Sequence, residues 1–271
     1  MEITLHFGAH RCATTSFQEY VRRNAAELKQ QGVAFWGPET TRETDLIALK
    51  TMTDASRAEL QHELDLCQSR GVTHLLVSEE NFLGMMQQNF HKGELYPEAR
   101  LRAQLVSGAF GARVTAIALN IRALNTYWAS LAGYAARNGK HFGPHMRWQK
   151  IAKHDRSWRA VVTDLADVFP GIPLYVLPFE EFAGHPDAQL AQLLRSNTPE
   201  RSSNLWLSKD EDARPQGLNS AQEMKLMATF ADDLTWLADG ADGLAQLCLM
   251  SETARGAATP AYDRIDERNA T

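Results

Sequence analysis

Short runs of apolar residues alternate along the chain with longer stretches in which apolar residues recur every three or four positions. The short runs predict buried strands, and the longer stretches predict amphipathic helices. The predicted strands cover residues 3–7, 33–38, 73–82, 112–122 and 172–182. The predicted helices cover residues 14–31, 55–70, 97–110, 124–137, 155–169, 186–196 and 219–239.

This alternation predicts the fold. Strand–helix–strand units form parallel sheets with helices on both faces, so we expect an α/β protein, a three-layer α/β/α arrangement around a mostly parallel sheet. We expect one domain over residues 1–271, with a helical C-terminal part from about residue 205. Ligands bind such sheets beyond the carboxyl ends of the strands. The candidate residues are therefore those after predicted strands, in 8–15, 79–81 and 120–130.

Composition and charge exclude some classes of function. The 271 residues are 44% hydrophobic and 23% charged, as in ordinary globular proteins. The net charge of −5 argues against a general nucleic-acid binder, which needs a basic surface. Three scattered cysteines, Cys12, Cys67 and Cys248, suit a reducing compartment. With no signal-peptide pattern and no apolar run of membrane-spanning length, we expect a cytoplasmic protein without a membrane span.

The loop "GAHRCATTS" after the first strand is suited to binding an anion. Backbone N–H groups at the start of a helix have no partner within the helix, and the helix dipole adds partial positive charge there. Arg11 adds a permanent charge, and Thr14 and Thr15 add hydroxyl donors. A nucleoside-triphosphate loop has lysine directly before the threonine, where this chain has Ala13. The plainer alternative is a strand–turn–helix connection that needed only a glycine at Gly8.

The segment "HFGAHRCATTSFQ" resembles the 5′-phosphosulfate loop of sulfotransferases that use 3′-phosphoadenosine 5′-phosphosulfate, whose usual form is roughly HxGxxKTGTTxLQ. The positions that match are His6, Gly8, Thr14, Thr15 and Gln18. The resemblance implies a P-loop NTPase-like fold and a donor held by this loop. The residues it assigns to the donor are Gly8, His10, Arg11, Cys12, Ala13, Thr14, Thr15 and Ser16.

The chain departs from the family's pattern at three loop positions. Arg11, Cys12 and Ala13 stand where the family has lysine, threonine and glycine. The lysine contacts the sulfuryl group during transfer, so the resemblance gives Arg11 a catalytic role, with the same charge but a different shape. Alanine suits position 13 only if its φ is negative, because alanine rarely adopts the positive φ that glycine tolerates.

A second signature of the family follows a central strand. The family has an arginine at the strand end and a serine eight residues later, and both bind the 3′-phosphate. "LNIRALNTYWASLAGY" supplies Arg122 and Ser130 at that spacing, which places the serine about two helical turns beyond the strand. Arginines after strands and serines on helices are also common without a ligand. Arg214, in a loop near the C-terminal part, is a further candidate for the 3′-phosphate, or a solvated loop arginine.

The segment "LLVSEENF" offers a general base. It resembles the "SSE" segment of bacterial family members, which gives Glu80 that role. Neighbouring residues of an extended segment point to opposite sides, so only one of Glu79 and Glu80 can face a cleft. The alternatives are a carboxylate pair that holds Mg²⁺, two solvated charges, or a base elsewhere, at His10 or Glu39.

These observations predict a sulfotransferase that moves a sulfuryl group from 3′-phosphoadenosine 5′-phosphosulfate to a hydroxyl or amine. The catalytic residues would be Arg11 and Glu80, and no metal is required. The acceptor would be a small molecule, a glycan or a lipid. Two other hypotheses stay open: a P-loop kinase or other nucleotide-binding protein, and a regulatory protein that binds the nucleotide but is catalytically weak.

Overall fold

A central sheet of six strands, all parallel, organises the molecule. The computed structural model describes residues 1–43, 53–139, 144–195 and 218–250. The strand order is β2-β3-β1-β4-β5-β6. The strands are β1 (Glu2–His6), β2 (Val33–Trp36), β3 (His74–Ser78), β4 (Ala116–Ile121), β5 (Leu174–Pro178) and β6 (Gln246–Leu247). The expected α/β class with a three-layer α/β/α arrangement is confirmed.

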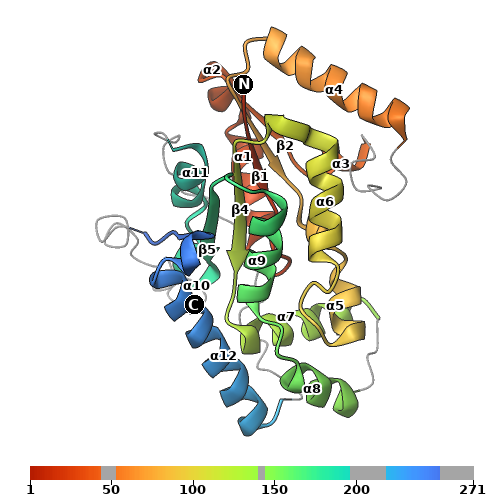
Figure 1. Ribbon diagram of the computed structural model, residues 1–271, viewed down its shortest axis with the longest axis vertical. Coiled ribbons are helices and arrows are strands. Elements are labelled where there is room, and N and C mark those ends of the chain that lie inside the picture. The colour runs from red at the N-terminus through yellow and green to blue at the C-terminus, as the bar shows by residue number, and fades with distance from the viewer. Residues whose placement is uncertain (44–52, 140–143, 196–217, 251–271) are drawn as a thin grey trace, which may run out of the picture.

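Helices cover both faces of this sheet (Figure 1). One face is covered by α1 (Thr14–Arg23), α2 (Ala25–Gln30) and α11 (Pro186–Leu194). The other is covered by α4 (Asp54–Ser69), α6 (Ala99–Phe110) and α9 (Trp158–Val168). The remaining α-helices are α3 (Pro38–Glu43), α5 (Met86–Lys92), α7 (Leu124–Arg137), α8 (Pro144–Lys153), α10 (Phe179–Phe182) and α12 (Ser220–Ala238). Among the described residues, 3₁₀ turns span Glu80–Leu83 (η2), Gly111–Arg113 (η3) and Ala241–Gly243 (η5).

The chain reverses its direction across the sheet at β1. From β1 it runs through α1 and α2 to the edge strand β2, comes back to β3, and then crosses through α6 to β4 on the far side of β1. Right-handed crossovers that run in opposite directions place their helices on opposite faces. The carboxyl end of β1 therefore lies where helices diverge, the place where such sheets bind ligands.

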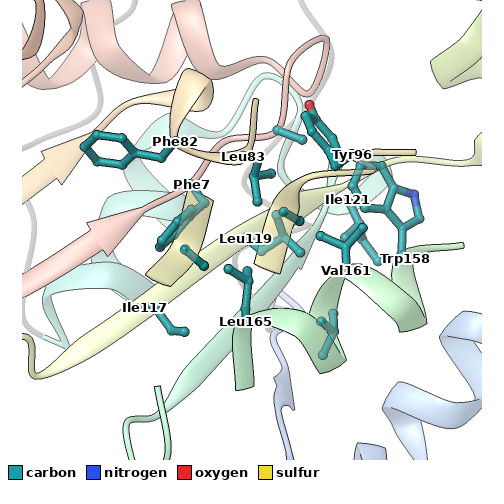
Figure 2. Close-up of a cluster of buried hydrophobic side chains, with 14 of the residues drawn as sticks. Phe7, Phe82, Leu83, Tyr96, Ile117, Leu119, Ile121, Trp158, Val161 and Leu165 are labelled. Carbon is teal, nitrogen blue, oxygen red and sulfur yellow. The ribbon is translucent and has the colours of Figure 1, made fainter. Parts of the chain in front are cut away.

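The larger core lies between the sheet and the α6/α9 layer (Figure 2). Alternate residues of β4, Ile117, Leu119 and Ile121, belong to this core, and Val161 and Leu165 of α9 lie in it as well. All five side chains are fully buried. Burying a side chain of this size contributes roughly 1.5–3 kcal/mol, so this layer holds the strand ends of the site rigidly.

Some elements differ from the sequence-based expectations. The helix expected over residues 14–31 is broken at Asn24, whose side-chain amide donates to the Tyr20 carbonyl (2.8 Å) in competition with the helix backbone. The strands expected over 73–82 and 172–182 end earlier, at Ser78 and Pro178, and short helical turns follow. The elements α3, α5, α8, α10 and β6 were not predicted. Most of them are too short to show a periodic pattern. None of the helices in the described residues is long and apolar enough to span a bilayer.

Candidate functional site

The loop after β1 is fastened to the end of β4. The Gly8 carbonyl accepts a hydrogen bond from the Asn120 N–H, and the Ala9 N–H donates to the Asn120 carbonyl (3.1 Å). Gly8 has a φ of +85°, and a Cβ built on it would lie 2.7 Å from the Glu80 Cβ. Only glycine fits here, because both the backbone conformation and the approach of Glu80 exclude a side chain.

The start of α1 is not capped by a side chain. Its N-cap is Ala13, which has no side chain that could accept a hydrogen bond from the first turn. Ala13 has a φ of +60°, so the condition under which alanine suits this position, a negative φ, is not met; Arg11 is also left-handed at +62°. Such conformations cost non-glycine residues about 1–3 kcal/mol each and cluster at functional loops. Thr14 is buried, whereas Thr15 is exposed at the mouth of the loop.

Arg11 reaches from the loop to α7. Its Nε donates to the Ser130 Oγ (2.9 Å), and its guanidinium lies 5.1 Å from the centre of the Tyr134 ring. Ser130 and Tyr134 are four residues apart on α7 and therefore share a face of that helix. The guanidinium thus lies along α7, beside the serine that the resemblance to sulfotransferases assigns to a 3′-phosphate.

Arg122 lies at the end of β4 and reaches the corner where the first loop meets α7. Its Nη1 donates to the Arg11 carbonyl (2.8 Å), and its Nε donates to the Thr126 Oγ1 (3.1 Å). The guanidinium stacks over the Phe179 ring, 4.1 Å from its centre. The Trp158 indole donates to the Arg122 carbonyl (2.7 Å), which fixes the backbone from which this arginine departs. The two predicted anion-binding places are therefore adjacent and share hydrogen bonds.

Two loop side chains are buried in the protein. The His10 Nδ1 lies 3.0 Å from the Tyr96 hydroxyl and its Nε2 lies 3.3 Å from the Asn81 Oδ1. Burial lowers the pKa of His10 to about 4, against the opposing effects of the Asn81 hydrogen bond and the Glu79 charge. Burial likewise raises the pKa of the Cys12 thiol to about 12. His10 and Cys12 are therefore uncharged at neutral pH, and a ligand in this loop would meet their backbone rather than their side chains.

The two neighbouring carboxylates have separate roles. Glu79 is fully buried and accepts hydrogen bonds from the Asn81 N–H (2.9 Å), the Asn81 amide (2.7 Å) and the Thr41 hydroxyl (2.7 Å). Glu80 is partly exposed, and its Oε2 accepts a hydrogen bond from the Gln18 amide (3.1 Å). Glu79 serves as a structural cap of η2, which leaves Glu80 to face the cleft.

A cleft of about 730 Å³ lies beside Glu80. It is bounded by α1, α2, β2 and α3, and by the end of α4. Thr15, Gln18 and Glu80 line it, so one open space borders both the anion loop and the exposed carboxylate. Its volume is that of a typical small-molecule site. Glu39 also lines this cleft, but it is strongly exposed and paired with Arg22 (3.4 Å).

The structure brings together most of the residues singled out from the sequence. Gly8, Arg11, Arg122 and Ser130 meet at one corner, and Glu80 lies against Gly8. Ser16 is partly exposed in the first turn of α1. Arg214 lies outside the described residues. The aromatic rings that contact the two arginines, Tyr134 and Phe179, were not predicted, although Tyr134 stands four positions after Ser130 in the sequence.

Comparisons of the chain with protein-family models, with curated proteins and with solved structures give no match. The chemistry is therefore argued from the contacts above. These contacts show a corner with two guanidinium groups and a hydroxyl, an uncapped helix start and a carboxylate on an open cleft.

Proposed function

We propose that this chain is a sulfotransferase that uses 3′-phosphoadenosine 5′-phosphosulfate and transfers the sulfuryl group to a hydroxyl or amine. One observation carries the proposal: the loop at the start of α1 and the Arg122/Ser130 pair meet, through the 2.9 Å contact of Arg11 with Ser130 and the 2.8 Å contact of Arg122 with the Arg11 carbonyl. A nucleotide with two separated negative groups needs two such places within the length of one ribose.

Each residue of the proposed site has a role that follows from its chemistry. Arg122 and Ser130 supply a charged fork and a hydroxyl for the 3′-phosphate, and the first turn of α1 supplies N–H donors, with Thr15, for the 5′-phosphosulfate. In the transfer, an acceptor oxygen or nitrogen forms a bond to sulfur while the bond from sulfur to the 5′-phosphate oxygen breaks. Glu80 takes the proton that the acceptor loses, and the bisphosphate nucleotide leaves with the electron pair of the broken bond.

The cleft beside Glu80 is the proposed acceptor site. An acceptor there would touch Glu80 on one side and the exposed Thr15 at the loop mouth on the other. Because charge builds up on the transferred group, fixed donors aimed at that place supply most of the catalysis. Arg11 is the cation of the loop itself. A role at the sulfuryl group requires its guanidinium to contact the donor as well as Ser130 of α7.

Calorimetry with adenosine 3′,5′-bisphosphate tests the proposal. We expect binding without Mg²⁺, and we expect the Arg122→Ala variant to bind at least about tenfold more weakly, since a charged hydrogen bond is worth about 1.5–3 kcal/mol. The same variant should bind adenosine 5′-phosphosulfate almost normally, because that nucleotide lacks the 3′-phosphate. Arg113→Ala is the control, because Arg113 pairs with Asp65 on the surface. Binding of ATP only with Mg²⁺, and none of the bisphosphate, would instead favour a kinase.

A second candidate function is supported by the placement of Arg11. Its guanidinium is engaged by Ser130 and lies over Tyr134, on the α7 side of the corner. A protein in which this arginine replaces the family's lysine could bind the nucleotide and act as a regulator. Bisphosphate binding with no sulfate transfer to a broad panel of alcohols, phenols and amines would support that function over catalysis.

A further inference from the structure

A line of buried polar side chains crosses the sheet directly beneath the candidate site. His6, Ser78 and Asn120 come from β1, β3 and β4, three adjacent strands, and all three are at most 1% exposed. Each lies at or near the carboxyl end of its strand, and none of them belongs to the α6/α9 core. Gln18 of α1 and Gln189 of α11 pack onto them from the helical layer on the opposite face.

Hydrogen bonds join these side chains into one chain that ends at Glu80. The Gln18 Nε2 donates to the Glu80 Oε2 (3.1 Å) and to the Ser78 Oγ (3.2 Å). The Ser78 Oγ lies 2.8 Å from the His6 Nδ1. The His6 Nε2 lies 2.6 Å from the Asn120 Oδ1, which also accepts a hydrogen bond from the Gln189 Nε2 (3.1 Å).

The carboxylate at one end sets the direction of every bond in this chain. An ionised carboxylate only accepts hydrogen bonds, so the Gln18 side chain must present its NH₂ group to Glu80. The same NH₂ group donates to the Ser78 oxygen, which leaves the Ser78 hydroxyl proton for the His6 Nδ1. His6 then carries its proton on Nε2 and donates to Asn120. Burial lowers the pKa of His6 to about 4, which agrees with a neutral imidazole that accepts on one nitrogen.

We propose that Gln18 is the positioning residue of Glu80, and that the buried Ser78–His6–Asn120 chain holds the Gln18 amide in the required orientation. The inference rests on the proposed function, in which Glu80 is the base. By occupying Oε2, Gln18 fixes the carboxylate plane and leaves Oε1 for the proton of the acceptor. Buried networks of this kind hold their members in one arrangement, because each broken link leaves a polar group unpaired.

Donor hydrolysis tests this role without knowledge of the acceptor, because water takes the acceptor's place at Glu80. The assay measures the release of sulfate from 3′-phosphoadenosine 5′-phosphosulfate across pH 5–9. Bisphosphate binding, measured beside it by calorimetry, reports donor binding independently of the base. The charged residues that line the same cleft stay unchanged in every variant: Glu19, Arg22, Lys29, Glu39, Arg42 and Arg70.

Two substitutions of Gln18 should differ in how the rate of donor hydrolysis depends on pH. Gln18→Leu removes the donor, so we expect hydrolysis to fall at least about tenfold at all pH values, with bisphosphate binding within about twofold of the unsubstituted protein. Gln18→Glu places a second carboxyl group about 3 Å from Glu80, where the two groups share one proton. The protonated glutamic acid replaces the glutamine donor, so this variant should be active at pH 5–6 and lose activity as the pH rises above 7.

A structural role for Gln18 would not produce such a rescue by protonation. Gln30→Leu, at an exposed position on α2, is the control and should leave both measurements unchanged. Ser78→Ala tests the inner part of the chain, with an expected loss of hydrolysis of about threefold to tenfold. A Gln18→Leu variant at full rate, or a Gln18→Glu variant with the original pH profile, would overturn the inference.

The failure of this inference differs from the failure of the proposed function. A protein that binds no bisphosphate overturns the sulfotransferase proposal itself. A protein that binds the bisphosphate but hydrolyses no donor keeps the nucleotide site and overturns the positioning role of Gln18. If a Gln18 variant fails to fold, shown by loss of cooperative unfolding, the Ser78→Ala variant alone tests the inference. Unchanged donor hydrolysis by Ser78→Ala would then overturn it.

Discussion

Two buried histidines should make the protein lose stability in mild acid. His6 and His10 lie at the carboxyl end of β1 and in the following loop, and burial lowers the pKa of each from 6.5 to about 4. In the unfolded chain each histidine takes up a proton below about pH 6.5, whereas in the folded protein it stays neutral until about pH 4. Between these two values protons bind preferentially to the unfolded state, so the free energy of unfolding falls as the pH falls.

The size of the effect follows from the two pKa values. The difference between 6.5 and about 4 corresponds to about 3 kcal/mol for each histidine once the pH is below both values. At pH 5 the unfolded histidine is almost fully protonated and the folded one is mostly neutral, so about 2 kcal/mol of that amount is already lost. The two residues together should therefore lower the free energy of unfolding by about 4 kcal/mol between pH 7.5 and pH 5.

Urea denaturation of the unsubstituted protein and of two variants at pH 7.5, 6.5, 5.5 and 5 measures this dependence of the free energy of unfolding on pH. The variants are His10→Gln and, as a control, His62→Gln at an exposed position of α4. We expect His10→Gln to be less stable at pH 7.5, because it loses the Tyr96 and Asn81 contacts, but to lose about 2 kcal/mol less between pH 7.5 and pH 5. The slope with pH is the informative quantity, since His74 and buried carboxyl groups contribute equally to all three proteins.

Two results would refute the reasoning. The first is a His10→Gln variant whose stability falls with pH as steeply as that of the unsubstituted protein. The second is a His62→Gln control that flattens the slope as much as His10→Gln does. The first outcome would mean that folding does not lower the pKa of His10. The second would mean that the slope does not depend on the burial of the histidine.

Three further substitutions, one of them with a matched comparison on α2, test the loop backbone and the packing around the site. Ala13→Gly should raise the free energy of unfolding by up to about 1 kcal/mol in urea, because a left-handed alanine is strained, whereas Ala25→Gly on α2 should lower it by about as much. Gly8→Ala should cost about 2–4 kcal/mol, since its φ is +85° and its Cβ would collide with Glu80; a neutral effect would contradict the close approach. Asp233→Ala removes hydrogen bonds from Ser157 (2.6 Å) and the start of α9 (3.0 Å), and thermal unfolding should show a loss of about 2–3 kcal/mol.

The local sequence pattern was enough to predict five of the six strands and the position of the first loop. Residues 3–7 are a short run in which apolar Ile3, Leu5 and Phe7 alternate with Thr4 and His6. The glycine after it is followed by apolar residues at helical spacing, so a strand, a loop and a helix start were predicted within a few residues. The helix over 124–137 was also predicted with its observed bounds. Elements such as β6, with two residues, were missed because they form only by pairing with a neighbour, here β5.

The local sequence pattern did not predict the backbone conformation of the first loop. Alanine suits position 13 only with a negative φ, but the structure holds it at +60°. Such a conformation persists only where surrounding contacts outweigh the strain. The loop is held to β4 by the hydrogen bonds of Gly8 and Ala9 with Asn120, and the Arg11 carbonyl accepts a hydrogen bond from Arg122, which follows β4. A sequence pattern over a few residues contains no information about a partner more than a hundred residues away.

The sequence by itself determined which residues could carry the chemistry: the loop arginine and threonines, the Arg122/Ser130 spacing and the pair of carboxylates. The tertiary structure decided how they act. It buried Glu79 in hydrogen bonds and left Glu80 on the cleft, laid Arg11 along α7 beside Ser130, and joined Glu80 to His6 through Gln18 and Ser78. The physical reason is that residue type and spacing set local conformation, whereas burial and hydrogen-bond partners depend on strands and helices that meet only in the folded chain.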